Sequence, residues 1–474
     1  MTLRLLAAAA LAVLLTGCAS FTPDGGMAPV LSAASLDLRQ ETLKIDSPEK
    51  AAAAQARVRD LLAKPLDPDG AVRVALLNNR NLQAEYNALG IAEADYVAST
   101  LPESPTVTFE RVTAAGILDI ERRLIADLLS LATLPARREI GEKRFEAARF
   151  RAIEATFRTA AETRRAWYRA VAATQAVSFL EQARLSAEAA AELTTKLGEA
   201  GSSSKLDQAR AAAFHAEISN DLARARLRAV TEREALTRRL GLWGADTGYR
   251  LPTRLPPLPK AVETSTELEA RAVLHRVDLT ADRLELAALA RSLGLTEATR
   301  FVSAVELAGI SATEWEKDGP DTHRTRRRGF ELEATIPIFD LGETSVRRAR
   351  ETYMQAVNRL AAKAVEVRSE ARAGYAAYRA SYDIARAYQT RILPLRRIVG
   401  EQAVLEYNGM LKDVFTLLTT ARESAASNLA AIEAKRDFFI AAVDFQSALI
   451  GGGAGSGSPA APSAAPAEAG GEGH

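Results

Sequence analysis

The pattern of apolar and polar residues changes its period in the second half of the chain. Residues 330–336 alternate, so that apolar side chains fall on one face of an extended strand and polar side chains on the other. Pro337 and Gly342 interrupt the alternation, and from Glu343 apolar residues recur at helical spacing for about fifty residues. This pattern predicts a strand that leads directly into a very long helix.

Long helices are predicted in two parts of the chain. Small or apolar residues recur about every 3.5 residues over 346–385, which is the spacing of a coiled-coil seam. A similar alanine-rich helix is predicted over 136–197, and sixty helical residues measure roughly 90 Å. Each long helix is followed by a turn and a returning helix, which ends near Leu240 or Leu449. Pro394 is expected to kink the second long helix.

The two halves of the chain repeat the same order of segments. Residues 75–82 match residues 272–279 at a spacing of 197, and Gly201 matches Gly409 at a spacing of 208. The chain is therefore predicted to be a tandem duplication. The spacing grows because the second half holds an insertion, and the polar segment 311–328 is expected to be that insertion, a loop between two strands.

Each copy is expected to contain a β-hairpin. Strands are predicted at 300–310 and 326–338 in the second copy, and at 105–112 in the first, with a partner within 118–131 that does not alternate cleanly. Four strands cannot close a barrel, whereas three chains would supply twelve. No stretch after the N-terminus reaches eighteen uninterrupted apolar residues, so any crossing of a membrane would be made by strands.

The predicted fold class is mainly α, with long antiparallel coiled-coil helices from two tandem repeats and two β-hairpins. Residues 67–100 and about 47–63 are expected to be helical. The expected segments are a signal peptide at 1–17, a lipidated N-terminal arm at 18–66, repeat 1 at 67–250, a linker at 251–263, repeat 2 at 264–450 and a disordered tail at 451–474.

The N-terminus has the pattern of an export signal. Arg4 precedes an apolar run over 5–15, which is too short to span a bilayer. The following Leu-Thr-Gly-Cys resembles the bacterial lipoprotein signal, which implies cleavage before Cys18 and acylation of its thiol. Cys18 is the one cysteine of the chain, so no disulfide can form within it. Ala19 and Ser20 imply, by the same resemblance, anchoring in the outer membrane.

Composition and motifs argue against other classes of function. Charged residues make up 26% of the chain with a formal net charge of +1, so no field suited to nucleic acid is expected. No arrangement typical of a catalytic triad, phosphate loop or dinucleotide turn is present. The four histidines are scattered without metal-ligand spacing. We therefore expect no enzyme, no catalytic or metal-binding residue, and no cofactor besides the lipid on Cys18.

Two groups of side chains allow more than one interpretation. The seam tyrosines are interpreted as packing residues rather than substrate contacts, and they are Tyr353, Tyr375, Tyr378 and Tyr382. A basic run could contact phosphates of an outer leaflet or belong to a solvated loop. Its members are Arg324, Arg326, Arg327 and Arg328.

Three segments are similar to those of a known family. Residues 329–350 resemble the strand-to-helix passage of the outer-membrane efflux protein (TolC) family, in its lipoprotein branch. Residues 201–210 and 407–418 resemble its two helical hairpin tips, and the latter is also similar to members associated with heavy-metal resistance. The resemblance extends over nearly all of residues 18–451.

This resemblance implies an assembly in the cell envelope. Three chains would form a twelve-stranded β-barrel in the outer membrane and an α-helical barrel that extends into the periplasm. The implied partners are two further copies of the chain, outer-membrane lipid, a periplasmic adaptor (membrane fusion protein) and an inner-membrane pump, of the resistance-nodulation-division type.

The resemblance also implies a tunnel that closes at the hairpin tips through acidic residues. Asp207, six residues after Gly201, stands at the family's acidic position. Six residues after Gly409 stands Phe415, and the nearest acid is Asp413, so the second tip departs from the family pattern. Phe415 could instead form an apolar constriction. Asp207 and Asp413 are either pore-facing gate residues or capping and solvated residues beside a turn.

Two functions remain open at this point. The first is a passive export duct for small toxic compounds or metal ions, driven by the inner-membrane pump, and a type I secretion role is compatible with it. The alternative is a periplasmic coiled-coil lipoprotein that acts as a structural spacer or adaptor without a pore. The duplicated hairpins favour the duct, because a spacer needs no alternating strands.

Overall fold

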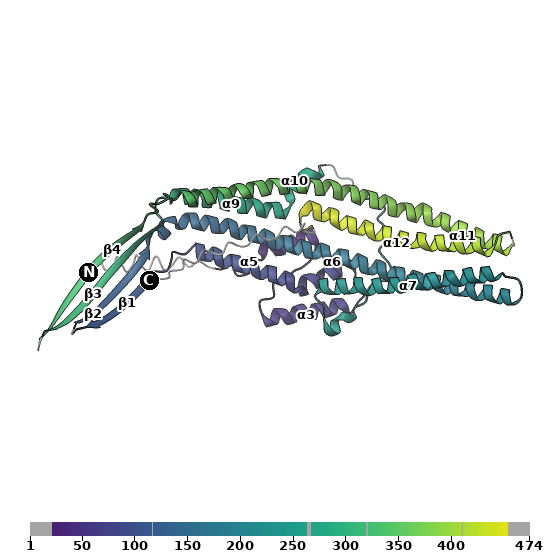
Figure 1. Cartoon of the computed structure of the whole chain (residues 1–474), viewed down its shortest axis with the longest axis horizontal. Coiled ribbons are helices and arrows are strands. Elements are labelled where there is room, and N and C mark those ends of the chain that lie inside the picture. Colours follow the sequence, from purple (N-terminus) through teal and green to yellow (C-terminus); the bar gives the residue numbers. More distant parts are fainter. Residues whose placement is uncertain (1–20, 116, 263–266, 319–320, 410, 454–474) are drawn as a thin grey trace.

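The chain is an elongated rod with a sheet at one end and two helical hairpin tips at the other (Figure 1). The computed structural model describes residues 21–115, 117–262, 267–318, 321–409 and 411–453. The predicted signal peptide, the acylation site Cys18 and the predicted tail from residue 454 onward lie outside the described residues.

The same order of elements occurs twice. The first copy consists of α4 (Pro68–Asn78), α5 (Arg80–Ser99), β1 (Thr106–Ala114), β2 (Ile117–Asp127), α6 (Leu128–Glu199) and α7 (Lys205–Leu240). The second consists of α8 (Leu268–His275), α9 (Val277–Ala298), β3 (Ala304–Asp318), β4 (Asp321–Thr335), α10 (Glu343–Ala387), the π-helical turn η3 (Tyr388–Ile392), α11 (Leu393–Asn408) and α12 (Val414–Ile450). In the second copy, α10, η3 and α11 together therefore correspond to α6 of the first copy.

Shorter elements surround the middle of the rod. The N-terminal arm contains α2 (Ala28–Ala33), the π-helical turn η1 (Ala34–Leu38) and α3 (Pro48–Leu62), and the segment between the copies contains the 3-10 turn η2 (Gly244–Gly248). The arm is joined to the first copy by a buried chain of hydroxyls, in which Tyr86 lies 2.8 Å from Thr42 and 2.9 Å from Thr156.

The longest helix, α6, has 72 residues and is therefore roughly 110 Å long. It begins eight residues before the predicted start and contains Pro135 near its first turns. The corresponding helix of the second copy is interrupted where a kink was predicted, by η3 directly before Pro394. Proline has no N–H to donate, so the preceding turn rearranges its hydrogen bonds. Within the described ranges, no helix combines the length and hydrophobicity that a bilayer crossing needs.

The helical segment predicted over 67–100 is broken at Asn79, which has extended backbone and caps α5 with its side-chain oxygen. The second copy breaks at Arg276, the residue that the repeat spacing of 197 aligns with Asn79. Both side chains also reach the end of the returning helix. The Asn79 amide donates to the Arg239 carbonyl at 2.9 Å, and the Arg276 guanidinium donates to the Ala448 carbonyl at 3.4 Å.

The four strands form one antiparallel sheet in the order β1-β2-β3-β4. The predicted partner strand of the first copy is present as β2, in register with β1 from Ile117 to Ile125. The prediction of a polar loop over 311–328 is wrong. Those residues lie mostly within β3 and β4, which pair from Ala304 to Asp318. Polar residues suit a strand here because both faces of this part of the sheet carry them, Glu314 and Arg327 on one face and Arg324 and Arg326 on the other.

Aromatic side chains join the two copies at the middle of the rod. Tyr168 of α6 stacks on Phe439 of α12 with ring centroids 4.8 Å apart, and Phe438 contacts Tyr378 and Tyr382 of α10. Tyr375 packs against Phe445 in the same way. The predicted packing role is thus confirmed for Tyr375, Tyr378 and Tyr382.

A buried ion network holds the second copy together. Arg276 and Asp278 are 6% and 4% exposed, and their side chains are 2.8 Å apart. Arg276 also pairs with Glu370 of α10, and Lys363 of α10 lies 3.4 Å from Asp278. Burial by itself would raise the pKa of Asp278, but the hydrogen bonds and charge of Arg276, with Lys363, lower it below the ordinary value. Burial and then repulsion by Asp278 raise the pKa of Glu154 on α6.

Ionisation of Asp278 and ionisation of Glu154 are expected to change the stability of the fold in opposite directions. Because the pKa of Asp278 is lowered by folding, its ionised form stabilises the fold above about pH 4, and this contribution is lost as the pH falls through the lowered pKa. Asp278→Asn should therefore lower the free energy of unfolding at pH 7 by on the order of 3 kcal/mol, since it leaves the buried Arg276 charge poorly compensated.

Glu154→Gln is the matched control, because a carboxylate with a raised pKa destabilises the fold once it ionises. This variant should be slightly more stable than the wild type at pH 7. Urea unfolding of both variants at pH 5 and pH 7 measures the effect. Equal losses of stability in the two variants would contradict the assignment of the network.

Candidate functional site

The first hairpin tip is closed by backbone and side-chain caps. Gly201 has a φ of 77°, a conformation that favours glycine, and the Ser202 N–H donates to the Leu197 carbonyl at 2.7 Å. Helix α7 then begins with Ser204 as its N-cap. The Asp207 N–H donates to the Ser204 hydroxyl oxygen at 3.1 Å, and that hydroxyl donates to the Asp207 carboxylate at 2.6 Å.

The second tip uses a different turn. Gly409 has a φ of −80°, so it does not share the left-handed conformation of Gly201 with which the repeat aligns it. Helix α12 begins at Asp413, whose carboxylate accepts from the Thr416 N–H at 2.9 Å and from the Thr416 hydroxyl at 2.7 Å. These hydrogen bonds, with a smaller effect of the Arg210 charge, lower the pKa of Asp413.

The two tips use the same two kinds of group, a hydroxyl and a carboxylate, but in opposite positions. In α7 a hydroxyl caps the helix and the carboxylate of Asp207 stands three residues later, whereas in α12 the carboxylate of Asp413 caps and the Thr416 hydroxyl stands three residues later. Counted from the helix starts, Thr416 is thus the equivalent of Asp207, and Phe415 is the equivalent of Leu206. Asp413 is thus the N-cap of α12, whereas Asp207 stands in the first turn of α7 and accepts a hydrogen bond from the capping Ser204 hydroxyl.

A residue not expected from the sequence connects the two tips. Arg210 of α7 lies 3.6 Å from the Asp207 carboxylate, and its guanidinium lies 4.7 Å from the ring centre of Phe415 in α12. The ring remains 49% exposed. The structure therefore brings Asp207 and Phe415 together through Arg210. The spacing of three residues between Asp207 and Arg210 could have indicated their ion pair from the sequence. The contact between Arg210 and Phe415 could not be found in this way, because the two residues lie far apart in the chain.

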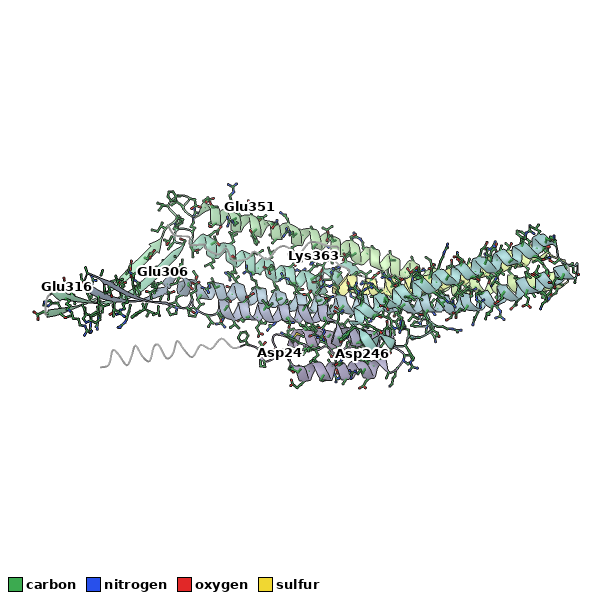
Figure 2. The ribbon with its side chains drawn as sticks, turned by 60° about the horizontal axis from the view of Figure 1, so that its bottom comes forward. Asp24, Asp246, Glu306, Glu316, Glu351 and Lys363 are labelled. Carbon is green, nitrogen blue, oxygen red and sulfur yellow. The ribbon has the colours of Figure 1, made fainter. Side chains whose placement is uncertain are left out.

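At the other end of the rod, the register of the sheet separates two chemically different faces. Directly paired residues of antiparallel strands lie on the same face. The carboxylates of one face, the acidic face, include Glu110, Asp119, Glu121, Asp127, Glu306, Glu314, Glu316, Asp321, Glu331 and Glu333. Glu306 lies near the helices and Glu316 toward the far end of the sheet (Figure 2).

Two arginines also lie on the acidic face, and both are paired with its carboxylates. Arg123 lies 2.9 Å from Glu121 and 3.5 Å from Glu331, and Arg327 lies 3.3 Å from Asp119 and 3.4 Å from Glu314. Carboxylates greatly outnumber arginines on this face among the described residues, so its field is strongly negative.

The opposite face, the apolar face, has no carboxylate among the described residues of the sheet. Its apolar members are Val107, Phe109, Leu118, Ile120, Leu124, Val305, Leu307, Trp315, Phe330 and Leu332. Its cations are Arg111, Arg122, Lys317, Arg324, Arg326 and Arg328. The basic run of the sequence is therefore divided, because Arg327 lies on the acidic face.

The strands pass into the helices through a joint that only glycine fits. Gly342 has a φ of 74°, and a Cβ atom there would lie 2.1 Å from the Arg300 carbonyl oxygen. Next to this joint, several apolar side chains are exposed, including Phe301, Ile338 and the fully exposed Phe339. Exposed apolar side chains therefore lie at the border between the sheet and the helices.

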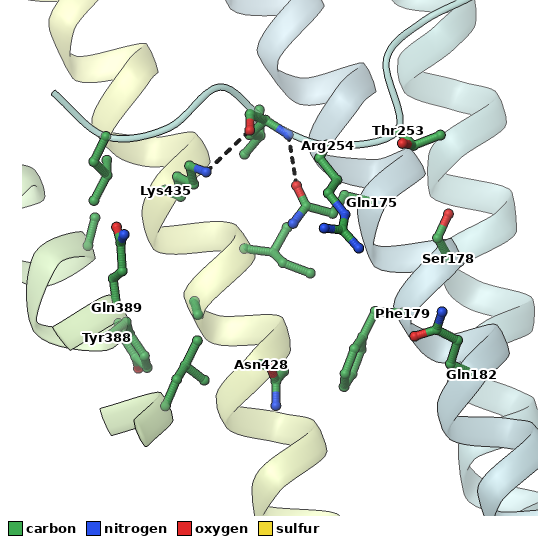
Figure 3. Close-up of a pocket in the computed structure, with 16 residues that line it drawn as sticks. Gln175, Ser178, Phe179, Gln182, Thr253, Arg254, Tyr388, Gln389, Asn428 and Lys435 are labelled. Atoms are coloured by element: carbon green, nitrogen blue, oxygen red, sulfur yellow. Dashed lines mark hydrogen bonds between the residues drawn. The ribbon is translucent and has the colours of Figure 1, made fainter. Parts of the chain in front are cut away.

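A cavity of about 570 Å³ lies between the two copies at the middle of the rod (Figure 3). Gln175 of α6 accepts a hydrogen bond from the Leu255 N–H at 2.9 Å, and Lys435 of α12 donates to the Leu255 carbonyl at 3.2 Å. The segment between the copies is thus fastened to both of them. Burial lowers the pKa of Lys435.

Comparison with known proteins identifies the fold. No protein-family model and no curated protein sequence matches the chain. Among solved structures, the chain is similar to CusC, described as forming a transmembrane channel (17% identity, TM-score 0.68, covering 83% of this chain and 92% of CusC). It is also similar to the outer-membrane channel OprN (19%, TM-score 0.68, 87% and 98%). A third is the open state of the Neisseria gonorrhoeae MtrE outer membrane channel (16%, TM-score 0.64, 84% and 89%).

The chain therefore has the fold of these outer-membrane channels. The predicted fold class, mainly α with long helices from two repeats and two β-hairpins, is confirmed. The resemblance seen in the sequence is confirmed at the level of the fold, and the neighbours are channels rather than enzymes.

The caps at the second tip lead to a direct test. Asp413→Ala should speed amide hydrogen exchange at the start of α12, because the Thr416 N–H loses its acceptor, whereas Asp413→Ser should keep protection near the wild-type level, since serine caps as well. Exchange of the peptide 413–418 can be followed by mass spectrometry. Equal exchange in the alanine variant and the wild type would contradict the capping role.

Proposed function

We propose that this chain is the outer-membrane channel of a tripartite efflux system, a passive export duct for small toxic compounds or metal ions. The observation that carries the proposal is the sheet, with one apolar and one acidic face in a chain that has the fold of outer-membrane channels. A sheet that crosses a bilayer needs an apolar face toward lipid and can keep a polar face toward a water-filled lumen.

The open edges of the sheet support a trimer. Strands β1 and β4 each have one neighbour in the chain, and β4 presents 15 residues along its free edge. Pairing β4 of one copy with β1 of the next satisfies both edges, and three copies give the twelve strands of a closed barrel. The same ring would place the hairpin tips together at its far end. A lipid on Cys18 would anchor each copy in the outer membrane.

The partners follow from the two ends of the rod. With the sheet in the outer membrane, α6, α7, α11 and α12 extend into the periplasm and present their tips to a periplasmic adaptor and an inner-membrane pump, of the resistance-nodulation-division type. The chain carries no residues of a catalytic site in this proposal, so the motive force comes from the pump. A spacer without a pore would leave the division of the sheet into two faces without a role.

Planar-bilayer recording tests the duct. The purified protein should crosslink as a trimer and give discrete conductance steps, with a reversal potential in a salt gradient that favours cations, because the acidic face lines the lumen. Replacing Glu306, Glu314 and Glu316 by Gln should reduce the cation preference, whereas Asp246→Asn, in the exposed turn η2, should not change it. A monomer or dimer that never conducts would support the spacer instead.

The role of the tip acids is tested by separating capping from charge. Asp207→Asn and Asp413→Asn remove the charge, and asparagine at position 413 still caps α12. If the carboxylates hold the tip closed, the double variant should raise the resting conductance several-fold, and Arg210→Gln should act in the same direction because it releases Phe415. Unchanged conductance in the asparagine variants, together with an intact trimer, would limit both acids to local contacts at the starts of their helices.

A further inference from the structure

Five arginines of the apolar face form a belt across the outer part of the sheet. We call the arginine belt the residues Arg111 of β1, Arg122 of β2, and Arg324, Arg326 and Arg328 of β4. The register places Arg122 and Arg328 in one row on either side of Ser311, and Arg326 in the next row beside Thr313. All five side chains are exposed. The belt therefore offers guanidinium donors on one surface.

The belt has no internal counterions. No carboxylate lies within ion-pair distance of any of its five arginines in the described part of the chain, whereas Arg123 and Arg327 on the acidic face each contact two. Two belt arginines rest on aromatic rings of their own face instead. Arg122 lies 5.9 Å from the ring centre of Phe109, and Arg324 lies 5.3 Å from that of Trp315. Their guanidinium groups are thus held at the surface of the sheet with hydrogen-bonding capacity left over.

The position of the belt is defined along β4. Phe330 and Leu332 occupy the apolar face nearest the helices, and Arg328 is the next residue outward on the same face, roughly 7 Å further along the strand. The belt ends at Arg324, roughly 14 Å beyond that. An arginine that faces lipid is costly at the middle of a bilayer and tolerated at its interface. The belt therefore lies at the headgroup level on the side of the membrane away from the helices.

Phosphate groups fit this surface better than any other common partner in a membrane. Arg324, Arg326 and Arg328 follow one another on one face of one strand, so their charges repel each other unless an anion lies between them. Guanidinium binds phosphate through two parallel hydrogen bonds, and the half-buried Ser311 lies in the same row as Arg122 and Arg328.

We propose that the arginine belt binds the phosphate groups of glycolipids in the outer leaflet of the outer membrane. This inference rests on the proposed function, because it takes the sheet to cross that membrane with its apolar face toward lipid. The occupant is a lipid surface, since the belt continues directly from the apolar residues that acyl chains would cover.

The test uses the full-length protein in dodecyl maltoside and counts bound lipid by native mass spectrometry. The probes are bisphosphorylated lipid A, the same lipid without its phosphates, and inorganic pyrophosphate as competitor. The wild type should retain the bisphosphorylated lipid at least ten times more tightly than the dephosphorylated one, with an affinity that falls as salt is raised. Replacing all five belt arginines by Gln should remove that preference.

The control variant carries Arg123→Gln and Arg327→Gln on the acidic face and should bind like the wild type. If the fivefold variant does not fold, Arg324→Gln, Arg326→Gln and Arg328→Gln on β4 alone should weaken binding severalfold. Equal binding of the two lipids, wild-type binding by the belt variants, or displacement of lipid by millimolar pyrophosphate would overturn the inference.

Conductance recorded on the same preparations separates this inference from the proposed function. A protein that conducts and binds both lipids equally would overturn the lipid belt and leave the duct in place. Phosphate-dependent lipid binding by a protein that never conducts would support the belt and reject the duct.

Discussion

The unpaired edges of the sheet impose the constraint on which the rest of the structure depends. A strand in an apolar medium must pair all its backbone N–H and C=O groups, and β1 and β4 each leave one side unpaired. Pairing with neighbouring copies, as in the proposed trimer, would meet that requirement. Because β2 and β4 continue almost directly into α6 and α10, closing the sheet into a ring would also arrange the long helices in a ring. At Gly342 the start of α10 lies so close to the Arg300 carbonyl that a side chain would not fit.

The two copies share the same breaks and ends of helices but use different side chains to satisfy the backbone groups there. Asn79 and Arg276 occupy the same break between two helices, and both reach carbonyl groups at the end of a returning helix, one through an amide and the other through a guanidinium. Likewise, the returning helices are capped by different side chains, α7 by the Ser204 hydroxyl and α12 by the Asp413 carboxylate. The need to satisfy helix ends is common to both copies, and more than one side chain can meet it.

Periodicity made the long helices, the duplication and most of the strands predictable from the sequence. The segment 311–328 was wrongly predicted to be a loop because its residues are mostly polar. In the structure they form strands whose polar side chains lie on both faces of the sheet. The break in the helix at Asn79 was not predicted, because the spacing of apolar residues does not change there. The contact of Arg210 with Phe415 depends on two tips that lie about 200 residues apart in the chain, and only the packing of α7 beside α12 brings them together.

The π turn η3 gives the two copies different helical phases. The repeat spacing is 207 between Arg165 and Arg372 but 208 between Gly201 and Gly409, so the second copy holds one additional residue in the interval that contains η3. A π turn holds more residues per turn than an α-helix, so η3 can take up this residue locally, where a continuous α-helix would be rotated by about 100° beyond the insertion. Both α10, before the turn, and α11, after it, pack against α12. A duplicated helix can thus change its length by one residue and keep the same neighbour along its whole course.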